Sequence, residues 1–104
     1  MTDLLKRQQE FTRLLPLLFN YIHSCGYEFT LGDAYRDPRC PYGHPRSLHG
    51  KKLAIDLNVF KDSEYLIYSN DHKPFGEFWE SIGGSWGGRF NDGNHYSLEF
   101  NDMR

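Results

Sequence analysis

Two short segments of the chain contain side chains of the types that bind a catalytic metal ion. The first runs from Ser47 to Asp56 and includes His49, and the second runs from Asp92 to His95. Two imidazoles and one carboxylate, with the fourth position left to water, are the usual protein ligands of a catalytic zinc ion. A further carboxylate that does not bind the metal supplies the general base such a site needs. The sequence therefore predicts a zinc hydrolase in which one Zn²⁺ is held by His49, Asp56 and His95.

Asp56 is the residue of this set that is hardest to explain otherwise. An acid in the middle of an apolar strand is costly unless it is paired or bound to a metal. Asp92 lies in a turn before His95, where it can hydrogen-bond the metal-bound water and take its proton. Taken singly, a histidine is more often a surface or hydrogen-bonded residue, and Asp92-Gly93 is equally well a plain turn. The combination favours the catalytic interpretation.

Two further residues are expected to contact the substrate. Arg36 ends a predicted strand, where its guanidinium could bind a substrate carboxylate or stabilise a developing oxyanion. It could equally form a local salt bridge beside Asp37. Trp86 lies among glycines and could form a groove wall or part of the core, and the sequence leaves both open.

The two cysteines, Cys25 and Cys40, are expected to be free thiols because the chain shows no signal peptide. With His23 and His44 they loosely resemble a structural zinc set. His23 and Cys25 are only two residues apart near a helix end, which gives poor tetrahedral geometry, so this alternative is disfavoured.

The start of the chain predicts one long helix. Thr2 can cap it, the apolar residues of one face recur at helical spacing as far as Ile22, and Gly26 ends it. Pro16 lies inside this pattern and should kink the helix or split it in two.

The remaining segments predict an antiparallel sheet and one short helix. Strands are expected over 27–35, 53–60, 65–68 and 95–100, a helix over 74–82, and loops over 37–47 and 83–88. Alternation places Asp56 on the less apolar side of its strand, and His95 opposite Tyr96. If these strands are neighbours, both side chains rise from one face and His49 can reach the same spot. The sequence thus predicts a small α+β domain with its N-terminal helix packed on an antiparallel sheet that carries the metal site.

Length and composition indicate a single domain and argue against a nucleic-acid-binding or membrane-spanning protein. The 104 residues are enough for a single domain over 1–104, and eight Phe, seven Tyr and two Trp can fill its core. A formal net charge of -2 without a basic stripe makes nucleic acid a poor partner. No apolar run approaches the roughly 20 residues of a membrane span. Because no signal peptide is visible, we expect synthesis in a cytoplasm.

The motifs resemble those of the zinc peptidases that include D-Ala-D-Ala carboxypeptidases and phage L-alanyl-D-glutamate endopeptidases. That family pattern is Ser-x-His, six residues, Asp, and later an acid three places before a His. Ser47-x-His49, Asp56 and Asp92-x-x-His95 match it in order and spacing. Three more stretches, 53–58, 76–80 and 83–90, look like a subset found in phages and prophages, and 26–36 looks like the strand that carries the family's substrate arginine.

The resemblance implies a hedgehog/DD-peptidase-like fold with His49, Asp56 and His95 as zinc ligands and Asp92 as general base. It implies Arg36 and, less firmly, Ser47 as substrate contacts. The implied substrate is the stem peptide of bacterial peptidoglycan, cleaved by a monomer made in the host cytoplasm. The enzyme would reach the wall after release, as an endolysin, or as part of a virion.

Departures from the family pattern leave the cleaved bond open. Lys52 stands where many members have Gly, and the loop after Arg36 lacks a Gln often found there. The leading prediction is an L-Ala–D-Glu endopeptidase, and a D-Ala-D-Ala carboxypeptidase is the alternative. A zinc-containing binding module without catalysis is the alternative from another class. The presence of Asp92 argues against it, because a module without turnover needs no general base.

Overall fold

The amphipathic pattern at the start of the chain forms a single helix, α1 (Asp3–Ser24), in the computed structural model, which describes residues 2–35 and 47–104. The Thr2 hydroxyl accepts a hydrogen bond from the backbone N–H of Leu5 at 3.1 Å, as predicted for an N-cap. Gly26 follows the helix with a φ of 87°, a conformation that favours glycine. The predicted split at Pro16 is wrong. Pro16 is exposed, so water can satisfy the carbonyl that loses its helical partner.

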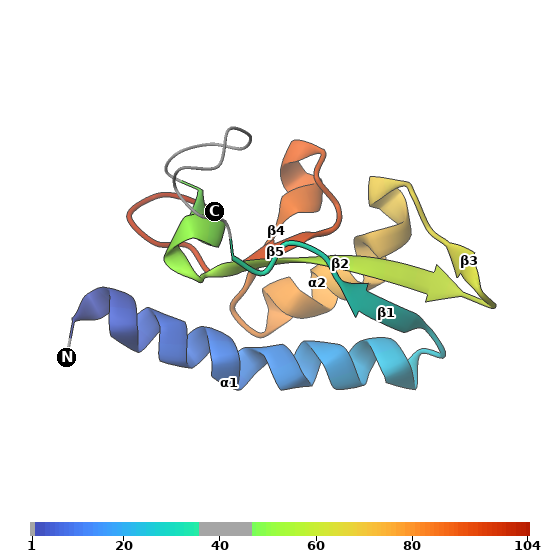
Figure 1. The fold of residues 1–104 in the computed structure, drawn as a ribbon, viewed down its shortest axis with the longest axis horizontal. Coiled ribbons are helices and arrows are strands. Elements are labelled where there is room, and N and C mark those ends of the chain that lie inside the picture. The colour runs from blue at the N-terminus through green and yellow to red at the C-terminus, as the bar shows by residue number, and fades with distance from the viewer. Residues whose placement is uncertain (1, 36–46) are drawn as a thin grey trace.

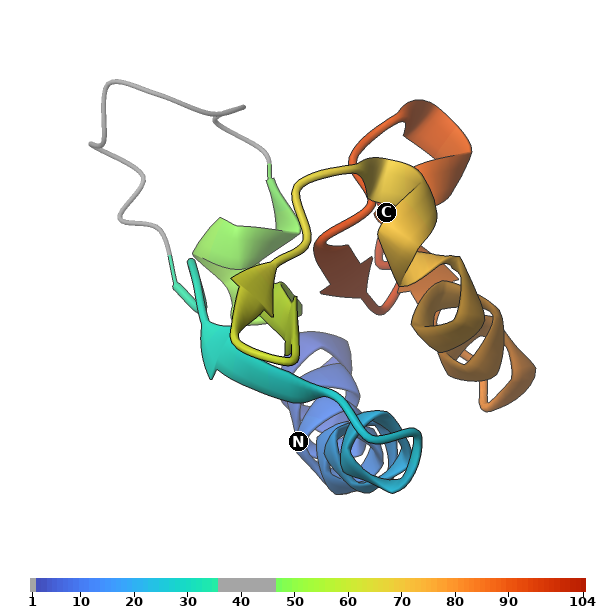
Figure 2. The same cartoon turned by 90° about the vertical axis from the view of Figure 1, so that its right-hand side faces the viewer.

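An antiparallel sheet lies against this helix, as the sequence predicts (Figure 1). Its strand order is β1-β2-β5-β4, and a short β3 also pairs with β2. Figure 2 shows β1 and β5 on opposite sides of β2. The strands are β1 (Glu28–Leu31), β2 (Ala54–Lys61), β3 (Glu64–Tyr65), β4 (Ser85–Trp86) and β5 (His95–Ser97).

The central strand β2 shows the predicted alternation. Leu53, just before the strand, and the β2 residues Ile55, Leu57 and Val59 are at most 4% exposed. They join the core that includes Phe11, Leu18 and Ile22 of α1. Asp56 and Asn58 alternate with them and are only half-buried. The face that carries Asp56 is therefore opposite the face that packs on α1.

Several predicted boundaries need correction. The strands expected over 27–35 and 95–100 are shorter, and the hairpin strand is Glu64–Tyr65 rather than 65–68. The hairpin closes through Asp62 and Ser63, whose φ values of 53° and 68° suit a tight two-residue turn. The glycine-rich segment predicted as a loop contains β4 and the 3₁₀ helix η3 (Gly87–Phe90).

The second helix, α2 (Lys73–Ser81), has Pro74 in its first turn as predicted. Two further 3₁₀ helices, η1 (Leu48–Lys51) and η2 (Ser69–His72), precede β2 and α2. Gly76 of α2 lies directly against the Trp86 ring, since a Cβ atom there would fall 2.0 Å from a ring carbon. This contact brings α2 close to the strand that leads into the segment from Gly87 to His95.

Candidate metal centre

Three side chains from separate elements converge on one point of the sheet. Asp56 of β2 and His95 of β5 are directly opposite one another in the antiparallel pairing. Opposed residues in such a pair project from the same face. The two strands are therefore neighbours, which is the condition under which the sequence placed both side chains on one face. His49 reaches the same point from η1.

Local backbone structure fixes the position of His49. The Ser47 hydroxyl caps η1 by accepting a hydrogen bond from the His49 N–H at 3.2 Å, and Leu48 anchors it in the core at 2% exposed. Lys52 ends η1 in the left-handed region with a φ of 58°. Lysine thus adopts there a conformation that glycine takes more easily, and the turn forms despite the departure noted in the sequence.

The distances within this group match those of a tetrahedral zinc site. His49 Nε2 lies 3.1 Å from Asp56 Oδ1, His95 Nδ1 lies 3.2 Å from His49 Nε2, and His95 Nδ1 lies 3.6 Å from Asp56 Oδ1. Metal bonds of about 2.0–2.1 Å at tetrahedral angles separate neighbouring ligand atoms by roughly 3.3–3.4 Å. The three atoms are therefore spaced for one shared ion.

The electrostatics also favour a bound cation. His49 and His95 are 2% and 5% exposed. Burial raises the pKa of Asp56, but hydrogen bonding and charge from His49 and His95 outweigh it and lower the pKa to about 2. These short contacts fall outside strict hydrogen-bond geometry, so Asp56 Oδ1 has no well-aligned partner among the described residues. An ionised carboxylate facing two buried imidazole nitrogens is a donor set that could hold a metal ion.

Asp92 lies beside this group without belonging to it. Its Oδ2 atom is 4.0 Å from His95 Nδ1, and its side chain is 53% exposed. Backbone hydrogen bonds hold the residue in place, because its N–H donates to the Gly87 carbonyl at 2.8 Å and its carbonyl accepts from the His95 N–H at 3.1 Å. A carboxylate in this position can reach a water molecule next to the three converging side chains.

Trp86 belongs to the core, which decides between the two alternatives that the sequence left open. Its side chain is buried, and the whole residue is 5% exposed. Its Nε1–H donates to the Gly93 carbonyl at 2.7 Å. This bond ties the segment between Asp92 and His95 to the core, so the buried ring positions that segment instead of offering its face to a substrate.

Some predicted residues lie outside the described ranges. Arg36 is one of them, as are Cys40 and His44, so neither the cysteine pairing nor the alternative zinc set is tested. Cys25 is exposed at the end of α1. His23 lies 3.6 Å from a Glu28 carboxylate oxygen and its ring stacks on Phe29.

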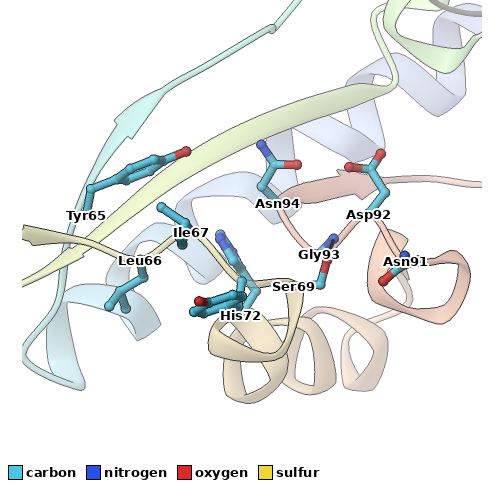
Figure 3. Close-up of a pocket in the computed structure, with 10 residues that line it drawn as sticks. Tyr65, Leu66, Ile67, Ser69, His72, Asn91, Asp92, Gly93 and Asn94 are labelled. Atoms are coloured by element: carbon cyan, nitrogen blue, oxygen red, sulfur yellow. Dashed lines mark hydrogen bonds between the residues drawn. The ribbon is translucent and has the colours of Figure 1, made fainter.

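A pocket of about 210 Å³, which no sequence pattern indicated, adjoins Asp92 (Figure 3). Residues 65–69 and His72 form one wall, and the segment 91–94 forms the other. The sequence also did not single out Phe90 as a residue near the site. Its ring centroid lies 5.8 Å from that of His95, and the residue is 48% exposed. The position of Asn94, between the predicted general base Asp92 and the predicted ligand His95, is the feature of the sequence that could have indicated a role for it.

His72, at the base of this pocket, should make stability depend on pH. Its ring is buried and shares a hydrogen bond of 2.8 Å with the Tyr96 hydroxyl. Burial lowers the pKa of His72 from 6.5 to about 4, against an opposing effect of Asp71. Above pH 6.5, His72 is neutral in both the folded and the unfolded chain, so it has no effect on stability there. Between pH 6.5 and pH 4, the unfolded chain protonates His72 but the folded protein does not. The free energy of unfolding therefore falls as the pH drops toward 4, by up to ~3 kcal/mol.

Urea unfolding at about pH 7.5 and about pH 5 tests this on wild type and His72→Gln. The loss of stability on acidification should be about 2 kcal/mol smaller in the variant, which has no proton to exclude. An equal loss in both proteins would mean that other groups account for the acid sensitivity.

A family model described as D-alanyl-D-alanine carboxypeptidase matches residues 42–98, more than half of the chain. This range contains His49, Asp56, Asp92 and His95. The chain therefore belongs to the M15 family of zinc peptidases, as the motifs predicted. No curated protein matches the sequence significantly. Among the described residues, no helix is long and apolar enough to cross a membrane.

Proposed function

We propose that this protein is a zinc endopeptidase that hydrolyses an amide bond in the stem peptide of bacterial peptidoglycan. The observation that carries the proposal is the convergence of His49, Asp56 and His95 at tetrahedral spacing, with the free Asp92 carboxylate beside them. Family membership supports the class of reaction, because the family's members are metallopeptidases.

The residues of the site divide into binding and proton-transfer roles. His49, Asp56 and His95 would hold the ion, and Zn²⁺ bound there would act as a Lewis acid and lower the pKa of water to about 7. Asp92 accepts the proton of the attacking water and passes it to the leaving nitrogen. Its exposure leaves it free to approach both groups. Arg36 would bind a substrate carboxylate or the developing oxyanion.

We propose the L-Ala–D-Glu bond as the one that is cut, in the setting of phage or prophage lysis or entry. The resemblance of residues 53–58 and 83–90 to the phage subset supports this choice. A D-Ala-D-Ala carboxypeptidase is the second candidate, because the matching family model carries that description. We expect residues 1–104 to work as one catalytic domain and as a monomer.

Purified peptidoglycan incubated with the zinc-loaded protein should release fragments with new termini at L-Ala and D-Glu, as read by mass spectrometry. Removing the metal with a chelator should abolish cleavage, and adding Zn²⁺ back should restore it. Release of single D-Ala residues would favour the carboxypeptidase. Stoichiometric zinc binding with no cleavage would favour the binding module.

A further inference from the structure

The pocket beside Asp92 has walls that the fold holds in place. The Gly93 N–H donates to the Ser69 hydroxyl at 2.9 Å, and the Gly93 carbonyl accepts from Trp86 Nε1 at 2.7 Å. A Cβ atom on Gly93 would fall 2.4 Å from the Ser69 Cα. The segments 65–72 and 91–94 are therefore fixed against each other, and the pocket between them exists before any substrate arrives.

The described lining of this pocket offers an anionic ligand no cationic side chain. The described residues that line it include one carboxylate, Asp92, and no lysine or arginine. His72 stays neutral at ordinary pH, because burial lowers its pKa to about 4. A substrate carboxylate placed here would meet the negative charge of Asp92 without a compensating cation from the described lining. Uncharged groups that hydrogen-bond would not meet this penalty.

Two of the polar side chains that line the pocket are suited to such hydrogen bonds. The backbone carbonyl of Asn94 accepts from the Leu57 N–H at 2.9 Å, which ties Asn94 to β2, but its half-buried amide side chain bonds to no described residue. The Tyr65 hydroxyl donates to Asn58 Oδ1 at a long 3.5 Å. Figure 3 shows the Tyr65 hydroxyl, the Asn94 amide and the Asp92 carboxylate in a row along the pocket.

We propose that this pocket binds an uncharged stretch of the substrate, held by the Asn94 amide and the Tyr65 hydroxyl, so that the substrate continues past the bond that is cut. The inference rests on the proposed peptidase function and specifies how that site recognises its substrate. A carboxypeptidase instead releases a residue with a charged terminus, which this pocket disfavours. The group bound is a peptide amide or a sugar hydroxyl, both of which offer donors and acceptors to neutral side chains.

Steady-state kinetics of the zinc-loaded protein test the role of Asn94. Asn94→Ala should raise KM about fivefold, leave kcat within about twofold and leave zinc content unchanged, as expected for one lost neutral hydrogen bond. Tyr65→Phe should raise KM by about two- to threefold. Asn70→Ala is the matched control, since Asn70 is exposed on η2 and does not line the pocket.

Two substrates distinguish whether the group bound in the pocket is a peptide amide or a sugar hydroxyl. If the pocket holds peptide amides, Asn94→Ala raises KM for both a free stem peptide and a disaccharide-linked one. If it holds sugar hydroxyls, KM rises only for the disaccharide-linked substrate. Equal KM values for Asn94→Ala and Asn70→Ala on both substrates would overturn the pocket proposal while the peptidase stands.

If the wild type cleaves neither substrate, a binding measurement can still test the pocket proposal apart from the proposed peptidase function. That result would refute the proposed function but leave the pocket open to test by nuclear magnetic resonance. The side-chain amide signals of Asn94 should shift when the zinc-loaded protein is titrated with the disaccharide-linked peptide. The absence of any shift would overturn the pocket proposal as well.

Discussion

Replacing Asp92 with alanine is expected to lower kcat by a factor of about 10²–10⁴ while the protein keeps its metal, because a positioned general base contributes that much to proton transfer. The geometry explains why the substitution should lower kcat without releasing the metal. Asp92 Oδ2 is 4.0 Å from His95 Nδ1 and the side chain is 53% exposed, whereas the three converging ligand atoms lie within 3.6 Å of one another. Removing the carboxylate therefore leaves the donor set intact.

The measurement is peptidoglycan hydrolysis together with zinc content for wild type and Asp92→Ala. Asp102→Asn serves as a matched control, since Asp102 is an exposed acid in the turn before Met103 and belongs neither to the converging group nor to the pocket lining. Loss of zinc from Asp92→Ala would make Asp92 a ligand instead of a base. Unchanged kcat would place the base elsewhere.

Replacing Asp56 with asparagine is expected to abolish both metal binding and activity. The substitution keeps the shape of the side chain but removes the negative charge that faces His49 and His95. A neutral amide is a much weaker ligand for zinc than a carboxylate, and the two imidazoles alone leave the site incomplete.

Thermal unfolding with and without zinc measures this loss. If the wild type binds zinc as proposed, zinc at about 100 times its dissociation constant should stabilise it by about 2.7 kcal/mol and raise Tm by roughly 10 °C or more in a domain of this size. Asp56→Asn should show almost no rise, whereas Asp62→Asn, in the exposed β2–β3 turn, should respond like wild type. A full rise in Asp56→Asn would exclude Asp56 as a ligand.

The convergence of the three candidate ligands could be predicted because their positions follow from local patterns. Alternation in β2 assigned Asp56 to the open face, and the same rule assigned His95 to one face of β5. The structure pairs these residues directly. His49 precedes β2 by only a short turn, so its approach to the same point required no long-range information.

The features that the sequence did not reveal depend on contacts between distant segments. Trp86 could be placed in the core only once Gly76 and Gly93 were seen against its ring and its Nε1 atom. The pocket arises where the irregular segment 65–72 meets residues 91–94, and neither segment has a periodic pattern that indicates its partner. The continuity of α1 through Pro16 depends on that residue's exposure to solvent, which local propensity does not include.

The direct pairing of Asp56 with His95 also bears on how the chain folds. A slip of one residue in the β2–β5 register would turn one of these side chains to the opposite face of the sheet. His49 and His95 are 46 residues apart in sequence, so metal binding would close a long loop of the chain. Zinc uptake during refolding would therefore report the moment at which these strands reach their native alignment, and misaligned chains would stay metal-free.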